Sequence, residues 1–236
     1  YLTWRLTGNH VTDRGDASGT GWFDPVGGDY VGELMAAAVD EADRWLARLP
    51  RVLGPNETAG ELESGAADAL GLPRGVQVGP GTGDNMAAAL GLGLSRGDVA
   101  MSLGTSGTVY AVSATATHDA SGAVAGFADA AGGYLPLVCT LNATKVTDTV
   151  AAWLGTDAAG LAALAVEPAA AGGETVLVPY FDGERTPNLP HATGSFLGLR
   201  TDTTREQLAL AAHDGVLCGL LGGFDALEAA GVDTDG

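Results

Sequence analysis

Positively charged side chains are scarce in this chain. Its 236 residues include 11 Lys and Arg against 29 Asp and Glu, which gives a formal net charge of −18. A surface this acidic repels nucleic acids and anionic lipids, so the sequence argues against both as partners. It also repels nucleotides at long range. Any phosphate site must therefore be local, built from backbone N–H groups, helix ends and a metal ion.

Cysteine is nearly absent, and long hydrophobic runs are missing. Cys139 and Cys218 are the only cysteines. They are too few for a disulfide framework or a four-cysteine metal site, which favours a reducing compartment. The four histidines are scattered without metal-ligand spacing. No run of about 18 apolar residues indicates a membrane span, and no signal region is evident. The sequence therefore predicts a cytoplasmic protein without a membrane partner.

Helical and extended patterns alternate along the chain. It opens at Tyr1, without Met, inside a helical pattern that Gly8 closes, so we expect an internal piece of a longer protein. Apolar spacing predicts one amphipathic helix over 31–49, and a loop near 72–75 predicts a domain boundary. The second half reads as strand, turn, helix, hairpin, strand, helix, strand and helix. That order predicts an α/β fold with a mixed sheet covered by helices.

Two later helices have candidate N-terminal caps. Asn142 or Thr144 is placed to cap the helix that follows the strand over 133–141, and Thr203 or Thr204 to cap the last long helix. Side-chain oxygens of these residue types accept the free N–H groups of a first helical turn.

Glycine is plentiful and gathers in two turns, "GPGTGDN" at 79–85 and "SLGTSGT" at 102–108. In the first turn, Asp84 comes just before a helical pattern. It can act as an N-cap, or as a general base on a rigid strand–helix junction with Gly81 and Gly83 clearing space. The two interpretations are compatible, because Asn85 could cap while Asp84 faces a cleft.

The second turn is suited to phosphate. Gly104 and Gly107 let the main chain approach a ligand, and Thr105, Ser106 and Thr108 add hydroxyl donors. No Gly-Lys-Ser/Thr follows, so it is not a Walker A loop, and no Gly-x-Gly-x-x-Gly opens a helix after a first strand. On its own, such a turn is also typical of an ordinary hairpin.

Together the motifs resemble a known family. "GTGDNMAAALGLG" followed by "DVAMSLGTSGTVY" resembles the FGGY carbohydrate kinases, and most of all the xylulokinases among them. "GERTP" at 183–187 is particular to such sugar kinases. "GSFLGLRTDTTREQLALAAHD" from Gly194 fits the second signature of the family, except that His213 stands where an apolar residue is usual. The resemblance covers essentially the whole chain.

The resemblance implies an actin-like, ribonuclease H-like ATPase fold. Residues 1–73 would be the C-terminal part of the FGGY N-terminal, sugar-binding domain. Residues 74–236 would be the nucleotide-binding C-terminal domain, truncated before its adenosine loop. The amino-terminal phosphate loop of the family, with its metal-linked acid, would lie upstream of Tyr1. We therefore expect this piece alone to bind ATP poorly and to be inactive.

Site residues follow from the resemblance position by position. Asp84 would be the catalytic base at the bottom of a crevice, and Asn85 would contact the sugar. The nucleotide would be held by four residues of the second turn and by a fifth residue further along the chain: Gly104, Thr105, Ser106, Gly107 and Asn142.

Four other residues admit two interpretations. Asp16 either contacts the substrate or forms an Asx turn. Glu184 and Arg185 either line the cleft or form an ion pair that fixes a loop. Lys145, the only lysine, is either close to the nucleotide or simply solvated on a helix surface.

The implied reaction is transfer of a phosphoryl group from ATP, with Mg²⁺, to D-xylulose, giving the 5-phosphate. Alternatives are another FGGY kinase acting on ribulose, gluconate or glycerol, and a non-catalytic nucleotide-dependent sugar sensor of the same fold. The partners would be small molecules, a ketopentose sugar and ATP, and the resemblance allows a homodimer.

Overall fold

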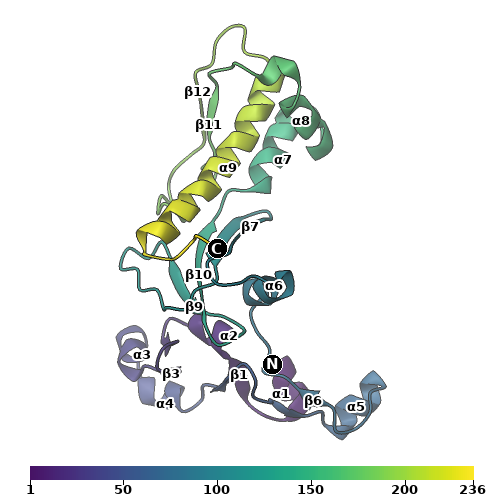
Figure 1. The fold of residues 1–236 in the computed structure, drawn as a ribbon, viewed down its shortest axis with the longest axis vertical. Coiled ribbons are helices and arrows are strands. Elements are labelled where there is room, and N and C mark those ends of the chain that lie inside the picture. The colour runs from purple at the N-terminus through teal and green to yellow at the C-terminus, as the bar shows by residue number, and fades with distance from the viewer.

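A computed structural model describes residues 1–236 as two lobes stacked along one axis, with the N-terminal lobe below and the C-terminal lobe above in Figure 1. The lower lobe carries five helices and six short strands. They are α1 (Leu2–Thr7), β1 (Val11–Asp13), α2 (Arg14–Ser18), β2 (Phe23–Asp24), β3 (Asp29–Tyr30), α3 (Gly32–Ala38), α4 (Ala42–Leu46), β4 (Arg51–Leu53), β5 (Gly60–Glu61), α5 (Ser64–Leu70) and β6 (Gln77–Val78).

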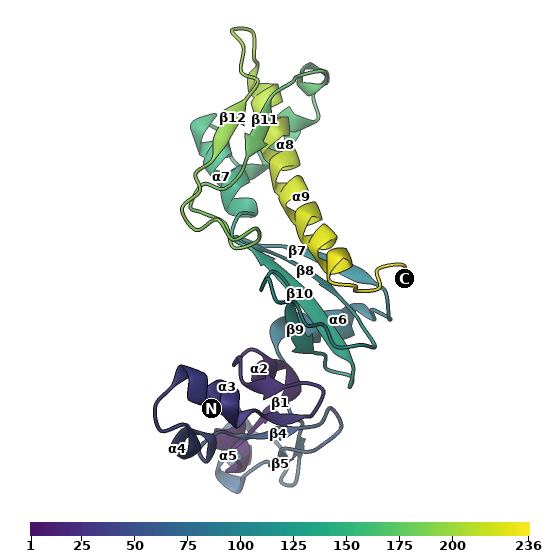
Figure 2. The ribbon, with the colours of Figure 1, turned by 90° about the vertical axis from the view of Figure 1, so that its left-hand side faces the viewer.

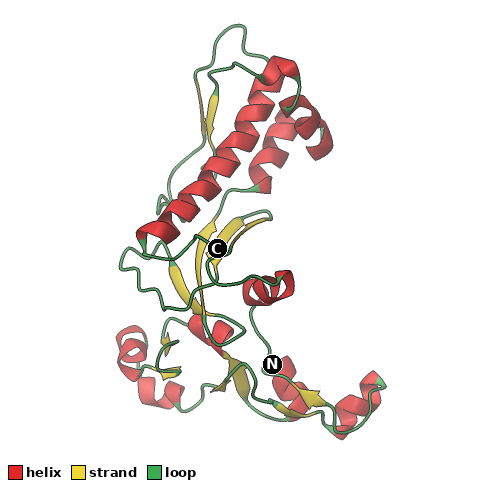
Figure 3. Cartoon of the chain, in the orientation of Figure 1, coloured by secondary structure: helices red, strands yellow, loops and turns green.

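The upper lobe is built on a four-stranded sheet that lies between helices (Figures 2 and 3). Its elements are α6 (Asp84–Leu92), β7 (Val99–Leu103), β8 (Gly107–Ala111), β9 (Ala125–Ala128), β10 (Tyr134–Thr140), α7 (Thr144–Trp153), α8 (Ala158–Ala165), the 3₁₀ turn η1 (Pro168–Ala170), β11 (Val176–Val178), β12 (Ser195–Leu197) and α9 (Arg205–Ala229).

The central sheet has the order β7-β8-β10-β9, and each neighbouring pair is antiparallel. The predicted mixed sheet is therefore wrong in detail. The strands β11 and β12 pair only with each other, and the single parallel pair, β1 with β4, lies in the lower lobe. The α/β class itself is confirmed.

Alternation along the strands covers both faces of the sheet. Val109 and Val138 are fully buried in the larger cluster, together with the buried face of α9. Tyr110 and Leu137 point the other way and pack with Met86 of α6. Gly223 lets α9 lie close to the sheet, because a Cβ there would meet Val109 at 3.2 Å. The sheet is thus a rigid platform with α9 on one side and α6 on the other.

The last helix is the most apolar segment of the chain. By length and composition α9 could cross a membrane, yet 39% of its most apolar window is buried inside the protein. The buried positions of α9 pack against the sheet. Its start is also as predicted: Thr204 accepts the Gln207 N–H and Gln207 reaches back to the Thr204 N–H, which forms a capping box.

Two predicted local features are wrong. The single helix over 31–49 is broken into α3 and α4, because Val39 is extended and Glu41 has a φ of 55°. The start of α7 has no side-chain cap from Asn142 or Thr144: its N-cap residue is Ala143, and backbone carbonyls of a neighbouring turn accept its first N–H groups instead.

The lobes meet at the segment 79–83. β6 still pairs with β5 of the lower lobe, whereas α6 packs on the upper sheet. The polypeptide therefore passes between lobes a few residues after the boundary predicted near 72–75. This crossing puts the first glycine-rich turn at the junction of the two lobes.

Candidate functional site

Asp84 is the first residue of α6, directly at the lobe junction. Gly83 occupies the N-cap position and supplies no side-chain cap. The Oδ1 atom of Asp84 accepts the Asn85 backbone N–H at 2.8 Å and its side-chain N–H at 3.1 Å. Neither Asp84 nor Asn85 caps α6 as an N-cap residue. Asp84 is exposed within residues 1–236, whereas the resemblance predicts it at the bottom of a crevice.

Asn85 connects the two glycine-rich segments. Its Oδ1 accepts the hydroxyl hydrogen of Thr108 at 3.3 Å. Thr108 is the second residue of β8, immediately after the "GTSG" turn. The acid of the first turn and the hydroxyl-rich second turn therefore belong to one hydrogen-bonded unit.

The second turn closes a β-hairpin, as predicted, between β7 and β8. The carbonyls of Gly104 and Thr105 accept the N–H groups of Thr144 and Ala143, at 2.9 and 3.3 Å. Both peptide bonds of the turn are trans. In a trans peptide, C=O and the following N–H point in opposite directions. The N–H groups of Thr105 and Ser106 therefore point away from α7.

The same two N–H groups have no acceptor within the chain, and the Thr105 and Ser106 hydroxyls have no hydrogen bond either. Both residues are exposed. Adjacent backbone N–H groups without partners can bind an anion without a positive side chain. The phosphate contact predicted for Thr105 and Ser106 stays a prediction.

The charge of Asp84 reaches side chains on the sheet beneath α6. Burial, and next the charge of Asp84, raise the pKa of Tyr110. Burial also raises the pKa of Cys139, the charge of Arg185 opposes that effect, and Asp84 adds to it. Asp84, Tyr110, Cys139 and Arg185 therefore share one neighbourhood above β8 and β10.

Two more carboxylates lie across the lobe junction. Asp13 caps α2 by accepting the Asp16 N–H at 3.0 Å, so Asp13 fills the local turn role considered for Asp16. A Cβ added to Gly83 would lie 3.3 Å from Oδ1 of Asp16. Although Asp16 is exposed by surface area, burial is the largest cause that raises its pKa, followed by Asp13 and then Asp84. The predicted substrate contact of Asp16 stays a prediction.

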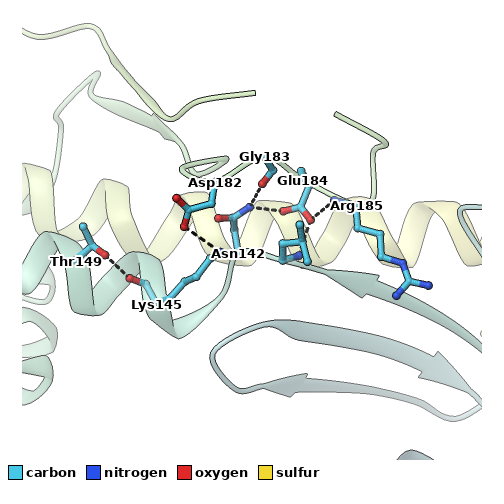
Figure 4. A network of polar contacts seen from close by, with 8 residues as sticks. Asn142, Lys145, Thr149, Asp182, Gly183, Glu184 and Arg185 are labelled. Atoms are coloured by element: carbon cyan, nitrogen blue, oxygen red, sulfur yellow. Dashed lines mark hydrogen bonds and ion pairs between the residues drawn. The ribbon is translucent and has the colours of Figure 1, made fainter. Parts of the chain in front are cut away.

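Asn142 and Glu184 are buried and hydrogen-bonded to each other (Figure 4). Asn142 is 2% exposed, and its amide group donates to Gly183 O and Glu184 Oε2, both at 2.7 Å. Its own Oδ1 has no partner. The predicted nucleotide contact of Asn142 stays a prediction. What the structure shows is a side chain bound to the 183–184 loop.

Glu184 and Arg185 do not form the ion pair considered from the sequence. Glu184 is 3% exposed and its hydrogen bonds come from N–H groups, whereas Arg185 is exposed. Lys145 forms an ion pair with Asp182, with Nζ and Oδ2 3.3 Å apart. No local pattern predicts the bonds to Glu184, because the partners Leu141 and Asn142 lie more than 40 residues away.

The residues present do not by themselves fit a magnesium ion. No group of three or more His, Cys, Asp or Glu side chains is arranged to hold a metal within residues 1–236. A cavity of about 670 Å³ opens elsewhere between the lobes, lined among others by Ser18, Asp24 and His118, and it contains neither Asp84 nor the turn. The candidate site therefore rests on the chemistry of its side chains and free N–H groups.

An acid at a lobe junction, linked to a turn with free N–H donors, suits an enzyme that transfers phosphoryl groups. Comparison with known families agrees. The N-terminal domain profile of the FGGY family of carbohydrate kinases matches residues 1–91, and its C-terminal domain profile matches residues 99–235. The chain belongs to the FGGY family of carbohydrate kinases.

Individual relatives carry the name xylulose kinase. The chain is 52% identical to a xylulose kinase of Streptomyces coelicolor, over 99% of this chain and 46% of that protein. Crystal structures of xylulose kinase from Bifidobacterium adolescentis (40% identity, TM-score 0.81, 98% of this chain and 50% of that one) and of a "xyloylose kinase" from Brucella ovis (31%, 0.89, 99% and 48%) are similar. They confirm the predicted actin-like fold. The chain spans about half the length of these relatives.

Proposed function

We propose that the protein containing this chain transfers the γ-phosphoryl group of ATP to a hydroxyl of D-xylulose, giving D-xylulose 5-phosphate. The observation that carries the proposal is the link from Asp84 through Asn85 to Thr108, which joins an acid to the glycine-rich turn at 104–107. The names and similarity of the relatives support the choice of sugar.

In this proposal Asp84 is the general base. Its carboxylate accepts the proton of the sugar hydroxyl while that oxygen forms a bond to the γ-phosphorus and the bond to the ADP oxygen breaks. The carboxylate is held at the helix start through its bonds with Asn85. Because Asp84 is exposed to solvent, its carboxylate is accessible to a bound sugar.

The turn acts on the other substrate. The N–H groups of Thr105 and Ser106, together with the two hydroxyls, hold phosphate oxygens of ATP, and Gly104 and Gly107 keep the backbone accessible. Catalysis of phosphoryl transfer consists largely of such positioning and charge stabilisation. Bound Mg²⁺ would neutralise phosphate charge; none of the steps described here depends on a metal ligand in this chain.

The test uses the complete protein in an assay of ADP release with D-xylulose, D-ribulose, gluconate and glycerol. We expect D-xylulose to be preferred. Asp84→Asn should lower kcat by about 10²–10⁴-fold, the usual contribution of a general base, and should leave the KM values largely unchanged. Asp68→Asn is the matched control, because Asp68 is an exposed acid of α5 in a surface ion pair with Arg74.

Two results would contradict the proposal. Preference for glycerol over every ketose would exclude D-xylulose as the natural substrate and would leave membership of the FGGY family unaffected. The second result is ATP hydrolysis that needs no sugar and is undiminished in Asp84→Ala. It would exclude Asp84 as the general base and would favour the sugar-sensor alternative.

A further inference from the structure

Glu184 is a buried acid without a cation. It is 3% exposed, and no Lys, Arg or His forms an ion pair with it. Its Oε1 accepts the backbone N–H groups of Leu141 at 2.5 Å and of Arg185 at 2.7 Å, and its Oε2 accepts the Asn142 side chain at 2.7 Å. A carboxylate is retained in the interior only where such donors replace water.

The loop that carries Glu184 is itself firmly closed. Glu184 and Leu189 exchange two backbone hydrogen bonds of 2.9 Å each. Gly183 has a φ of 79°, and a Cβ there would lie within 3 Å of the backbone of Pro190, so only glycine fits before Glu184. The carboxylate is therefore presented from a rigid support.

Four consecutive residues after β10 connect this loop to the turn at 104–107, which is proposed to bind phosphate. Leu141 and Asn142 bind Glu184, as Figure 4 shows for Asn142, and the next two residues, Ala143 and Thr144, bind the carbonyls of Thr105 and Gly104. The segment 141–144 thus has one end on the buried acid and the other on the turn.

Holding those two carbonyls in place also orients the backbone N–H groups that are proposed to bind phosphate. Because each peptide of the turn is trans, the direction of the Gly104 and Thr105 carbonyls sets the direction of the Thr105 and Ser106 N–H groups. A shift of the segment 141–144 would turn the carbonyls and would misdirect both donors.

We propose that Glu184 is a positioning residue: it holds the segment 141–144 and thereby aims the N–H groups of Thr105 and Ser106 at the phosphates of ATP. The proposal rests on the function proposed above. It assigns Glu184 no contact with substrate and no proton transfer. Its effect falls on nucleotide affinity, not on the sugar.

The experiment compares Glu184→Gln with the wild type in the complete protein. Gln keeps the shape and can accept the two backbone N–H groups, but its NH₂ faces the NH₂ of Asn142. We expect the KM for ATP to rise about tenfold, as for loss of a hydrogen bond to a charged group. The KM for the sugar should stay within about twofold.

Asp182→Asn is the matched control. It makes the same acid-to-amide change two residues away, and it breaks only the exposed pair with Lys145. We expect its KM for ATP to equal that of the wild type. Should Glu184→Gln fail to fold, Asn142→Ala removes the side-chain arm and leaves the two backbone bonds to Glu184 intact, with the same expected rise.

Hydrogen exchange of the peptide spanning 102–108, measured without nucleotide, separates this proposal from the proposed function. Glu184→Gln should speed exchange there and Asp182→Asn should not, whether or not the protein phosphorylates a sugar. Unchanged exchange in the turn, or equal increases in the KM values for ATP and sugar, would show that Glu184 only stabilises the fold and would overturn the proposal.

Discussion

At the scale of single residues, the acidic side chains at the lobe junction repel one another electrostatically. Asp13 is the N-cap of α2, Asp16 lies in α2 and Asp84 starts α6. Burial, and next the charges of Asp13 and Asp84, raise the pKa of Asp16. The native protein therefore binds a proton at Asp16 more tightly than the unfolded chain does. The free energy of unfolding therefore falls as the pH rises from 3.8, the ordinary pKa of an aspartate, through the raised pKa of Asp16 in the native protein.

Asp16→Asn should remove this loss. We expect the variant to melt about 1–2 °C above the wild type at pH 7, a small gain because solvent screens a partly exposed group. The gain should shrink as the pH falls and should vanish below about pH 4. Thermal melts from pH 3 to pH 8 measure it.

Asp225→Asn is the control, since Asp225 is exposed on α9 without a hydrogen bond or ion pair and the charge change is the same. An equal gain in that variant would mean that net charge, not the junction, sets the effect. A gain in Asp16→Asn that does not depend on pH would exclude the proposed repulsion.

Residue types, spacing and the family resemblance singled out the candidate groups of the site, whose roles stay predictions. Asp84 and the "GTSG" turn could be predicted, because a strand, glycines and a helix follow one another within a few residues. Glu184 could not be assigned its bonds, because its donors come from residues 141 and 142 and only the folded sheet brings them close. Local sequence therefore singles out candidate binding groups more readily than the distant contacts that hold them in place.

At the scale of elements, the break between α3 and α4 shows the limit of periodicity. Apolar spacing runs through 31–49 without glycine or proline between Ala38 and Ala42, so the sequence carries no stop signal. The chain turns there because Val39 is extended and Glu41 takes a left-handed conformation. Tertiary packing overrides helix propensity at this point.

Glu41 adopts this conformation against its own preference. A side chain at positive φ costs about 1–2 kcal/mol, which glycine avoids. Glu41→Gly should therefore stabilise the protein by about 0.5 kcal/mol, after the greater freedom of glycine in the unfolded chain and the loss of the exposed pair with Arg44 are subtracted. Urea denaturation measures the difference.

Glu33→Gly gives the opposite expectation. Glu33 lies in the first turn of α3, where helical φ suits any side chain. Glycine there should destabilise the protein by about 0.5–1 kcal/mol. Destabilisation by both variants would show that the left-handed turn at Glu41 carries no strain.

At the scale of the whole molecule, the sequence predicted two lobes but not how they contact each other. Turn residues predict a boundary near 72–75, whereas the chain crosses between the lobes at 79–83. The contact itself joins α2 to β9, more than 100 residues apart, through Ser18 Oγ, which accepts the Ala128 N–H at 3.1 Å and donates to Arg14 O at 2.7 Å. No local sequence pattern predicts a hydrogen bond between two residues so far apart in the chain. In the proposed function it matters because the charge of Asp84 acts on Asp16 across this junction.

Ser18→Ala tests whether this bond fixes the lobes relative to each other. It leaves the Ala128 N–H without its partner, a loss of about 0.5–1.5 kcal/mol that acts on the lobe contact alone. We expect hydrogen exchange over residues 125–128 to speed up about tenfold while exchange in α9 stays unchanged. Ser102→Ala, an exposed serine of β7 without a side-chain hydrogen bond, should change neither. Faster exchange throughout both lobes would mean that Ser18 supports the fold as a whole, and the orientation of the lobes would then depend on the 79–83 segment instead.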